Sequence, residues 1–241
     1  MGIAKDYFVG NEDLLDVVRR DRSNIYESRL LLLHRALTTK APGTILSIGA
    51  GAGTYELDLQ ERYGIHVELS LEPSAGFVQS ARSKGLNVLQ AGAQDYDYPE
   101  GFYDTIVYNG SSFGFIEDDE LEATLRRNWE SLRPGGRIIL QDVPLESALG
   151  ILLKAFQDFP ELAENKDYRE LLDGTVFYDL PPYKPFWHTT RYYIELLEKV
   201  GFSNFSYFQT VLANPPYEDE TVEEPIEGYD KGSYVAIVAE K

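Results

Sequence analysis

The 241-residue chain contains no cysteine, which removes disulfide bonds, thiolate metal ligands and cysteine nucleophiles together. Its three histidines, His34, His66 and His188, are too widely spread to indicate a metal site, so none is predicted. No apolar stretch reaches the roughly 18 residues that a membrane span needs, and the first residues lack the apolar core of a signal peptide. These absences predict a cytoplasmic protein that is not inserted in a membrane.

Basic residues are also scarce. Lysine and arginine number 22 against 40 aspartates and glutamates, so the net charge is −18. Affinity for nucleic acid depends mainly on lysine and arginine contacts to phosphates, so a DNA or RNA partner is disfavoured. Part of the negative charge lies late in the chain, at 218–220 and 223–224, where a solvated acidic loop is expected.

Apolar runs alternate with helical patterns through most of the chain. Strands are expected at 44–48, 66–71, 87–90, 104–108, 137–141, 202–212 and 232–240, with helices between most of them. Strands that alternate with helices at this spacing predict βαβ units and a parallel sheet wound by right-handed crossovers. We therefore expect one α/β domain over residues 1–241. The pattern is helical before residue 40 and loosens over 145–190.

The strongest local signal is a glycine-rich turn directly after the first expected strand, with Gly49, Gly51 and Gly53 at alternate positions. Glycine lacks a Cβ, so the backbone can turn tightly and approach a ligand, and the N-terminus of the following helix presents amide donors. Glu72 ends the second expected strand, where an acidic side chain can bind both ribose hydroxyls of a nucleoside. The pair predicts a nucleoside-containing cofactor.

The glycine spacing is G-x-G-x-G, and Thr54 stands where the dinucleotide fingerprint has glycine or alanine. This turn is similar to the first motif of class I S-adenosylmethionine-dependent methyltransferases. Later family motifs are resembled, in order, by 71–82, 91–95, 102–107, 132–137 and 190–202. The resemblance covers residues 41–145 and 187–240, and the segment 111–115 is similar to small-molecule members of the family.

Two positions depart from the family pattern. The family usually has an acidic residue two positions before the first glycine, and this chain has Ser47 there. The segment that borders the adenine often carries an acid, whereas here Gly92, Ala93 and Gln94 leave the adenine to backbone amides or to the Gln94 side chain.

The resemblance implies a Rossmann-like, seven-stranded, mostly parallel sheet with a C-terminal antiparallel hairpin. Residues 1–40 would form an N-terminal helical lid, and 145–190 an insertion that covers the substrate. The implied cofactor is S-adenosyl-L-methionine, with S-adenosyl-L-homocysteine as product. The implied cofactor-binding residues are Gly49, Gly51 and Gly53 for the methionine part, Glu72 for the ribose with Pro73 beside it, Ala93 and Gln94 for the adenine, and Asn109 for the methionine amine or the substrate.

Methyl transfer from a sulfonium is an in-line displacement, so the protein mainly aligns the acceptor and excludes water. No compact catalytic triad is expected. The candidate bases are His188 and Tyr183, with Asp142 as a weaker alternative. Aromatic walls suit an apolar or cationic ligand, and the candidate substrate-facing rings are Tyr7, Tyr26, Phe113 and Trp187.

The sequence therefore predicts methyl transfer to an oxygen, nitrogen or sulfur atom of a small molecule. Two alternatives stay open at this point. One is a protein that binds S-adenosylmethionine without turnover, and the other is an NAD-dependent oxidoreductase on a related fold. The substrate's identity, the acceptor atom and the oligomeric state do not follow from the sequence.

Overall fold

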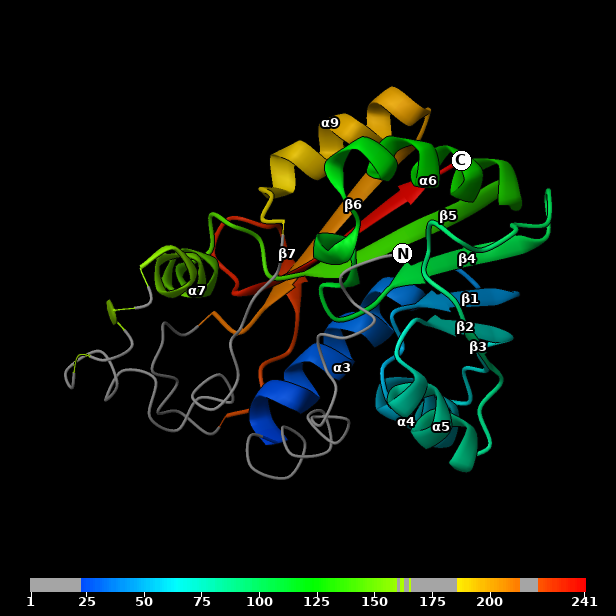
Figure 1. Ribbon diagram of the computed structural model, residues 1–241, viewed down its shortest axis with the longest axis horizontal. Helices are drawn as coiled ribbons and strands as arrows, with labels where there is room; N and C mark the ends of the chain where they lie inside the picture. The colour runs from blue at the N-terminus through cyan, green and yellow to red at the C-terminus, as the bar shows by residue number, and fades with distance from the viewer. Residues whose placement is uncertain (1–22, 160, 163–164, 166–185, 213–220) are drawn as a thin grey trace.

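The computed structural model describes residues 23–159, 161–162, 165, 186–212 and 221–241 and centres on one eight-stranded sheet (Figure 1). The strands are β1 Ile45–Ile48, β2 Leu69–Glu72, β3 Val88–Gln90, β4 Tyr103–Tyr108, β5 Leu132–Asp142, β6 Ser203–Thr210, β7 Ile226–Glu227 and β8 Tyr234–Glu240. Their order across the sheet is β3-β2-β1-β4-β5-β8-β6-β7. β1 to β5 run parallel, and β8 lies antiparallel between β5 and β6. The predicted fold class is confirmed.

Helices cover both faces of the sheet. They are α3 Ser23–Leu37, α4 Thr54–Tyr63, α5 Ala75–Ser83, the 3-10 helix η1 Ser112–Phe115, α6 Asp118–Ser131, α7 Ala148–Asp158 and α9 Thr190–Val200. α3, α4 and α5 lie on one face and α6 and α9 on the other, while α7 lies beyond the carboxyl end of β5 (Figure 1). No helix in these described ranges has the length and apolar character of a membrane span.

The sequence of β8 is a continuous apolar run because both faces of this strand are buried. Tyr234, Ala236 and Val238 face the core beneath α3 and α4, while the alternate residues Val235, Ile237 and Ala239 face the core beneath α6 and α9. Successive side chains of a strand point to opposite faces, so a strand covered on both sides is apolar throughout. β8 is therefore a central strand of a three-layer molecule.

The sheet has one strand more than the seven expected. β7 pairs with the outer side of β6 through Ile226 and Glu227, shortly after the acidic residues 223–224. Two residues are too few to produce a periodic signal, and acidic neighbours mask the single isoleucine. The N-terminal lid and the insertion were predicted over 1–40 and 145–190, and residues 1–22 and most of 160–185 lie outside the described ranges.

Arg137 ties the end of α3 to the sheet. It is 1% exposed, and its guanidinium donates to the carbonyls of Leu37 and Lys40 at 2.5 and 2.9 Å and to Thr39 Oγ1 at 2.8 Å. The last carbonyls of a helix have no partner within the helix. This buried side chain therefore supplies the C-terminal cap of α3 from β5.

We expect Arg137→Met to lower the free energy of unfolding by about 2–5 kcal/mol, because buried carbonyls lose their donors. Urea denaturation measures the change. The matched control is Arg133→Met on the same strand, where the side chain is 44% exposed and pairs with Asp104. An exposed ion pair contributes less than about 1 kcal/mol, so equal losses in the two variants would contradict the capping role.

Candidate active site

The glycine turn joins β1 to α4 at the carboxyl edge of the sheet. Gly49, Gly51 and Gly53 have φ angles of 77°, 56° and 74°. The amides of Gly49 and Ala50 donate to the Leu71 carbonyl at 2.9 and 3.3 Å, which fastens the turn to β2. A Cβ on Gly49 would lie 2.3 Å from the Cβ of Ser112 in η1. Only glycine can adopt the backbone conformation of this turn without strain, as the sequence predicts.

Glu72 is the last residue of β2 and is 5% exposed. Its two carboxylate oxygens accept hydrogen bonds from the amides of Gly51 and Ser74, each at 2.9 Å. Burial raises the pKa of Glu72 to about 7, although the two amides favour the charged form. The structure thus brings together the glycine turn and the acidic residue that the sequence pairs.

The loop after β3 lies next to Glu72. The Ala91 amide donates to the Glu72 carbonyl at 3.2 Å. Tyr98 Oη donates to the carbonyl of Ala93, which is 6% exposed, and Arg127 Nη1 donates to the carbonyl of Gln94 at 3.0 Å. Ala93 and Gln94 are therefore held beside the exit of β2, near Pro73, which is half-buried.

Asn109 follows β4 directly and is 3% exposed, with its amide bound to the Ile48 carbonyl at 3.0 Å. Glu56 in the first turn of α4 is 2% exposed, and its Oε1 accepts a hydrogen bond from Ser47 Oγ at 2.7 Å. Asn109 Oδ1 and Glu56 Oε2 have no hydrogen-bond partner within the described residues. Sequence reasoning missed Glu56, although the missing acid at position 47 was a signal to search for a carboxylate elsewhere.

Arg29 was also missed. This α3 residue is 8% exposed, and its guanidinium carbon lies 5.3 Å from the ring centre of Tyr55 and 4.6 Å from that of Tyr234. Arg29 Nη2 is 3.6 Å from where a Cβ on Gly110 would stand. A buried guanidinium therefore lies at the exit of β4. No local sequence pattern marks an arginine on the apolar side of a helix as a site residue.

Two of the candidate bases, His188 and Asp142, are buried and hydrogen-bonded. His188 is 8% exposed, its Nε2 lies 2.8 Å from Asp118 Oδ1, and its ring stacks on Tyr192 at 4.2 Å. Asp142 accepts hydrogen bonds from Tyr193 Oη at 2.8 Å and from the Val143 amide at 2.7 Å. Tyr183 lies outside the described residues.

The candidate substrate rings are distributed over the fold. Tyr26 is fully buried, stacks on Tyr55 at 4.7 Å and donates its hydroxyl to Asp58 at 2.8 Å, which fixes α3 against α4. Phe113, 2% exposed, packs edge-on between Tyr108 and Tyr193. Trp187 is half-buried and donates to Gln157 Oε1 at 2.5 Å. Tyr7 lies outside the described residues.

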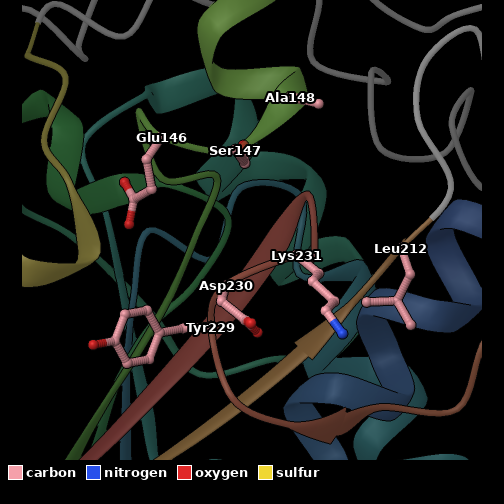
Figure 2. Close-up of a pocket in the computed structure, with 8 residues that line it drawn as sticks. Glu146, Ser147, Ala148, Leu212, Tyr229, Asp230 and Lys231 are labelled. Carbon is pink, nitrogen blue, oxygen red and sulfur yellow. The ribbon is translucent and has the colours of Figure 1, made fainter.

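A cavity of about 390 Å³ lies farther along the same edge of the sheet (Figure 2). It is lined by Glu146, Ser147, Ala148, Leu212, Tyr229, Asp230, Lys231 and Gly232. β8, which follows this lining, is three strand positions from β1, or about 14 Å at the usual spacing between strands. The cavity is therefore separate from the glycine turn and Glu72.

Comparison with known proteins agrees with this geometry. Residues 45–136 match the family model of the methyltransferase domain. An uncharacterized protein of Methanocaldococcus jannaschii is 25% identical over 217 residues, 90% of each chain. The demethylmenaquinone methyltransferase of Thermus thermophilus is 28% identical over 125 residues, 48% of this chain and 56% of that protein.

A solved structure from Thermotoga maritima, described as an S-adenosylmethionine-dependent and possible histamine N-methyltransferase, has the same fold. Its TM-score is 0.72 and its identity 24%, over 97% of this chain and 96% of that chain. Residues 45–136 therefore form a methyltransferase domain, and the chain has the class I fold of S-adenosylmethionine-dependent methyltransferases. The methyltransferase domain argues against the oxidoreductase alternative.

The site's residues fit this cofactor. The glycine turn packs too closely against η1 for a Cβ at Gly49, and the buried Glu72 carboxylate lies next to the turn. Asn109 Oδ1 is a buried acceptor that lacks a donor in the described part of the chain. Buried polar atoms are nearly always hydrogen-bonded, so a ligand with donor groups is expected to complete this one.

Proposed function

We propose that this methyltransferase transfers the methyl group of S-adenosylmethionine to an oxygen, nitrogen or sulfur atom of a small molecule. The main structural support lies at the exit of β4, where α3 buries Arg29 and where Tyr26 is hydrogen-bonded to α4. Bulky side chains buried at this edge favour a small ligand over a macromolecule. Demethylmenaquinone and histamine, named for two similar proteins, are both small molecules.

The proposal assigns binding and positioning to the residues around the glycine turn. Bound S-adenosylmethionine supplies an activated methyl group. Glu72 would accept hydrogen bonds from the ribose hydroxyls. Gly49, Gly51, Gly53 and Asn109 would hold the methionine part, and Pro73, Ala93 and Gln94 would border the adenine. Tyr26 and Arg29 would exclude water from the exit of β4.

A base is required only if the acceptor loses a proton during transfer. His188 and Tyr183 remain the proposed bases and Asp142 the weaker alternative, with Tyr7, Phe113 and Trp187 as proposed substrate contacts. We keep residues 1–241 as one domain, with 1–40 and 145–190 as its covers. The net charge of −18 supports a substrate other than nucleic acid, and the absence of cysteine supports a cytoplasmic location.

Cofactor affinity is expected to depend on pH through Glu72. Burial, and to a smaller degree the charge of Glu56, raises the pKa of Glu72 to about 7. Ribose hydroxyls donate to the ionised carboxylate, so ligand binding competes with protonation. The dissociation constant of S-adenosylhomocysteine should be constant above about pH 8 and rise about tenfold per pH unit below about pH 6.

Calorimetric titrations from pH 5 to 9 measure this dependence. Glu72→Gln is the control, because its amide does not titrate in this range. Its affinity should be lower and should lose the part of the pH dependence that Glu72 causes. An unchanged pH profile in Glu72→Gln would assign the dependence to another group, of which Glu56 is the nearest candidate.

The proposed substrate class is tested with S-adenosylmethionine labelled in its methyl group. The purified protein is incubated with pools of small amines, phenols, carboxylic acids and thiols, and separately with transfer RNA and with protein extract. Label is expected in a small-molecule product, together with S-adenosylhomocysteine. Label found only in RNA or protein would overturn the small-molecule proposal while leaving the methyltransferase family unchanged.

A further inference from the structure

Position 47, where the family's first motif usually carries an acid, is Ser47 here, and a carboxyl group from the next helix lies against it. Ser47 Oγ donates to Glu56 Oε1 at 2.7 Å. Glu56 stands three residues after Gly53, the N-terminal cap of α4, so its carboxylate lies in the first turn of the helix. A carboxylate there is favoured by the positive end of the helix dipole. The glycine turn therefore has a buried acid beside it, supplied by α4 instead of β1.

This acid retains an unused acceptor. Glu56 is 2% exposed and Asn109 is 3% exposed, yet Glu56 Oε2 and Asn109 Oδ1 have no hydrogen-bond partner in the described part of the chain. Leaving buried acceptors unsatisfied is costly. The nearby Lys84 ammonium is directed to the Ala52 carbonyl and Thr54 Oγ1, at 3.1 and 3.4 Å.

Two acceptors lack a donor within the described residues, and one of them belongs to a carboxyl group. A cation with several N–H donors would satisfy both. A primary ammonium has three donors in a compact group. The cofactor of this family carries such a group on its methionine part, and the glycine turn between β1 and α4 is where that part is expected. The other charged group of the methionine part, its carboxylate, would be repelled by Glu56.

We infer that Glu56 receives the α-ammonium of S-adenosylmethionine, with Asn109 Oδ1 as a second acceptor and Ser47 as the residue that positions the Glu56 carboxylate. This role concerns the cofactor alone and does not depend on which molecule is methylated.

The test compares ligands that differ only at the amino-acid end. S-adenosylhomocysteine carries both the ammonium and the carboxylate. The aminopropyl analogue of S-adenosylhomocysteine, which lacks the carboxylate, retains the ammonium. 5′-Methylthioadenosine retains the nucleoside and the sulfur but has neither charged group. Calorimetry on the full chain measures the affinity of each ligand for the wild type and for Glu56→Gln.

Glu56→Gln should bind S-adenosylhomocysteine and the aminopropyl analogue about 10- to 100-fold more weakly, the range for losing a hydrogen bond between charged groups. Its affinity for 5′-methylthioadenosine should change less than about threefold on the same grounds. Asp58→Asn is the matched control, because Asp58 is also buried on α4 but bonds to Tyr26. It should alter the affinities of all three ligands by similar factors.

Equal changes for all three ligands in Glu56→Gln, or none, would overturn the inference. A second variant covers the case in which Glu56→Gln fails to fold. Ser47→Asp combined with Glu56→Ser moves the acid to the position usual in the family and should bind S-adenosylhomocysteine within about tenfold of the wild type. If the double variant folds and binds 5′-methylthioadenosine but loses S-adenosylhomocysteine, the exchange of roles is wrong.

Discussion

Replacing Glu72 with alanine should weaken the binding of S-adenosylhomocysteine by about 100- to 10,000-fold. The proposed role gives Glu72 two hydrogen bonds to ribose hydroxyls, and bonds to a charged group contribute about 1.5–3 kcal/mol each. The same carboxylate also accepts the amides of Gly51 and Ser74, so alanine removes two anchors of the turn as well. Calorimetric titration with S-adenosylhomocysteine measures the effect.

The control for this experiment is Glu68→Ala. Glu68 precedes the same strand at its opposite end and is exposed, so its loss should leave the affinity within about twofold of the wild type. Thermal unfolding of both variants separates lost binding from lost folding. A folded Glu72→Ala protein with nearly normal affinity would show that the ribose is bound elsewhere.

Gly49→Ala should abolish measurable cofactor binding. The alanine Cβ would stand 2.3 Å from the Cβ of Ser112, so either η1 or the turn has to move. The φ angle of 77° adds strain of about 1 kcal/mol for any residue other than glycine. A turn displaced by even about 1 Å no longer matches the shape of the methionine part that it would hold. Titration with S-adenosylhomocysteine and a urea denaturation curve measure the two consequences.

Gly64→Ala is the control that separates backbone strain from a steric clash of the added Cβ. Gly64 ends α4 with a φ angle of 66°, and a Cβ there would have no heavy atom within 4 Å. This variant should lose about 1 kcal/mol of stability and keep its cofactor affinity. If Gly49→Ala behaves like Gly64→Ala, then the close approach of η1 to the glycine turn does not matter for binding.

The helix ends and the glycine turn could be predicted because each is marked by residues close together in the sequence. The α4 helix spans 54–63, and the glycines at 53 and 64 that mark its two ends can be read directly in the sequence. The helix α9 has Thr189 as a cap and Gly201 after it, which are also readable in one segment of sequence. The pairing of Gly51 with Glu72 followed from the order of strand, turn, helix and strand.

The packing neighbours of aromatic residues could not be predicted from the sequence. Tyr26 and Phe113 are predicted substrate contacts, and in the described chain both rings also pack against other aromatic rings. The sequence shows that a ring is present but not which neighbours surround it, and aromatic rings occur both in cores and in binding sites. β7 was missed for the related reason that a two-residue strand depends entirely on its partner β6.

The sequence by itself determined the order of strands and helices, the glycine turn and the acid at the end of β2, because each depends on residues close together in the chain. Only the tertiary structure decided which distant side chains meet. It placed Glu56 against Ser47 and beside Asn109, and it buried Arg29 between Tyr55 and Tyr234. Those contacts depend on how α3 and α4 pack against the sheet, and packing over such distances leaves no periodic trace in the sequence.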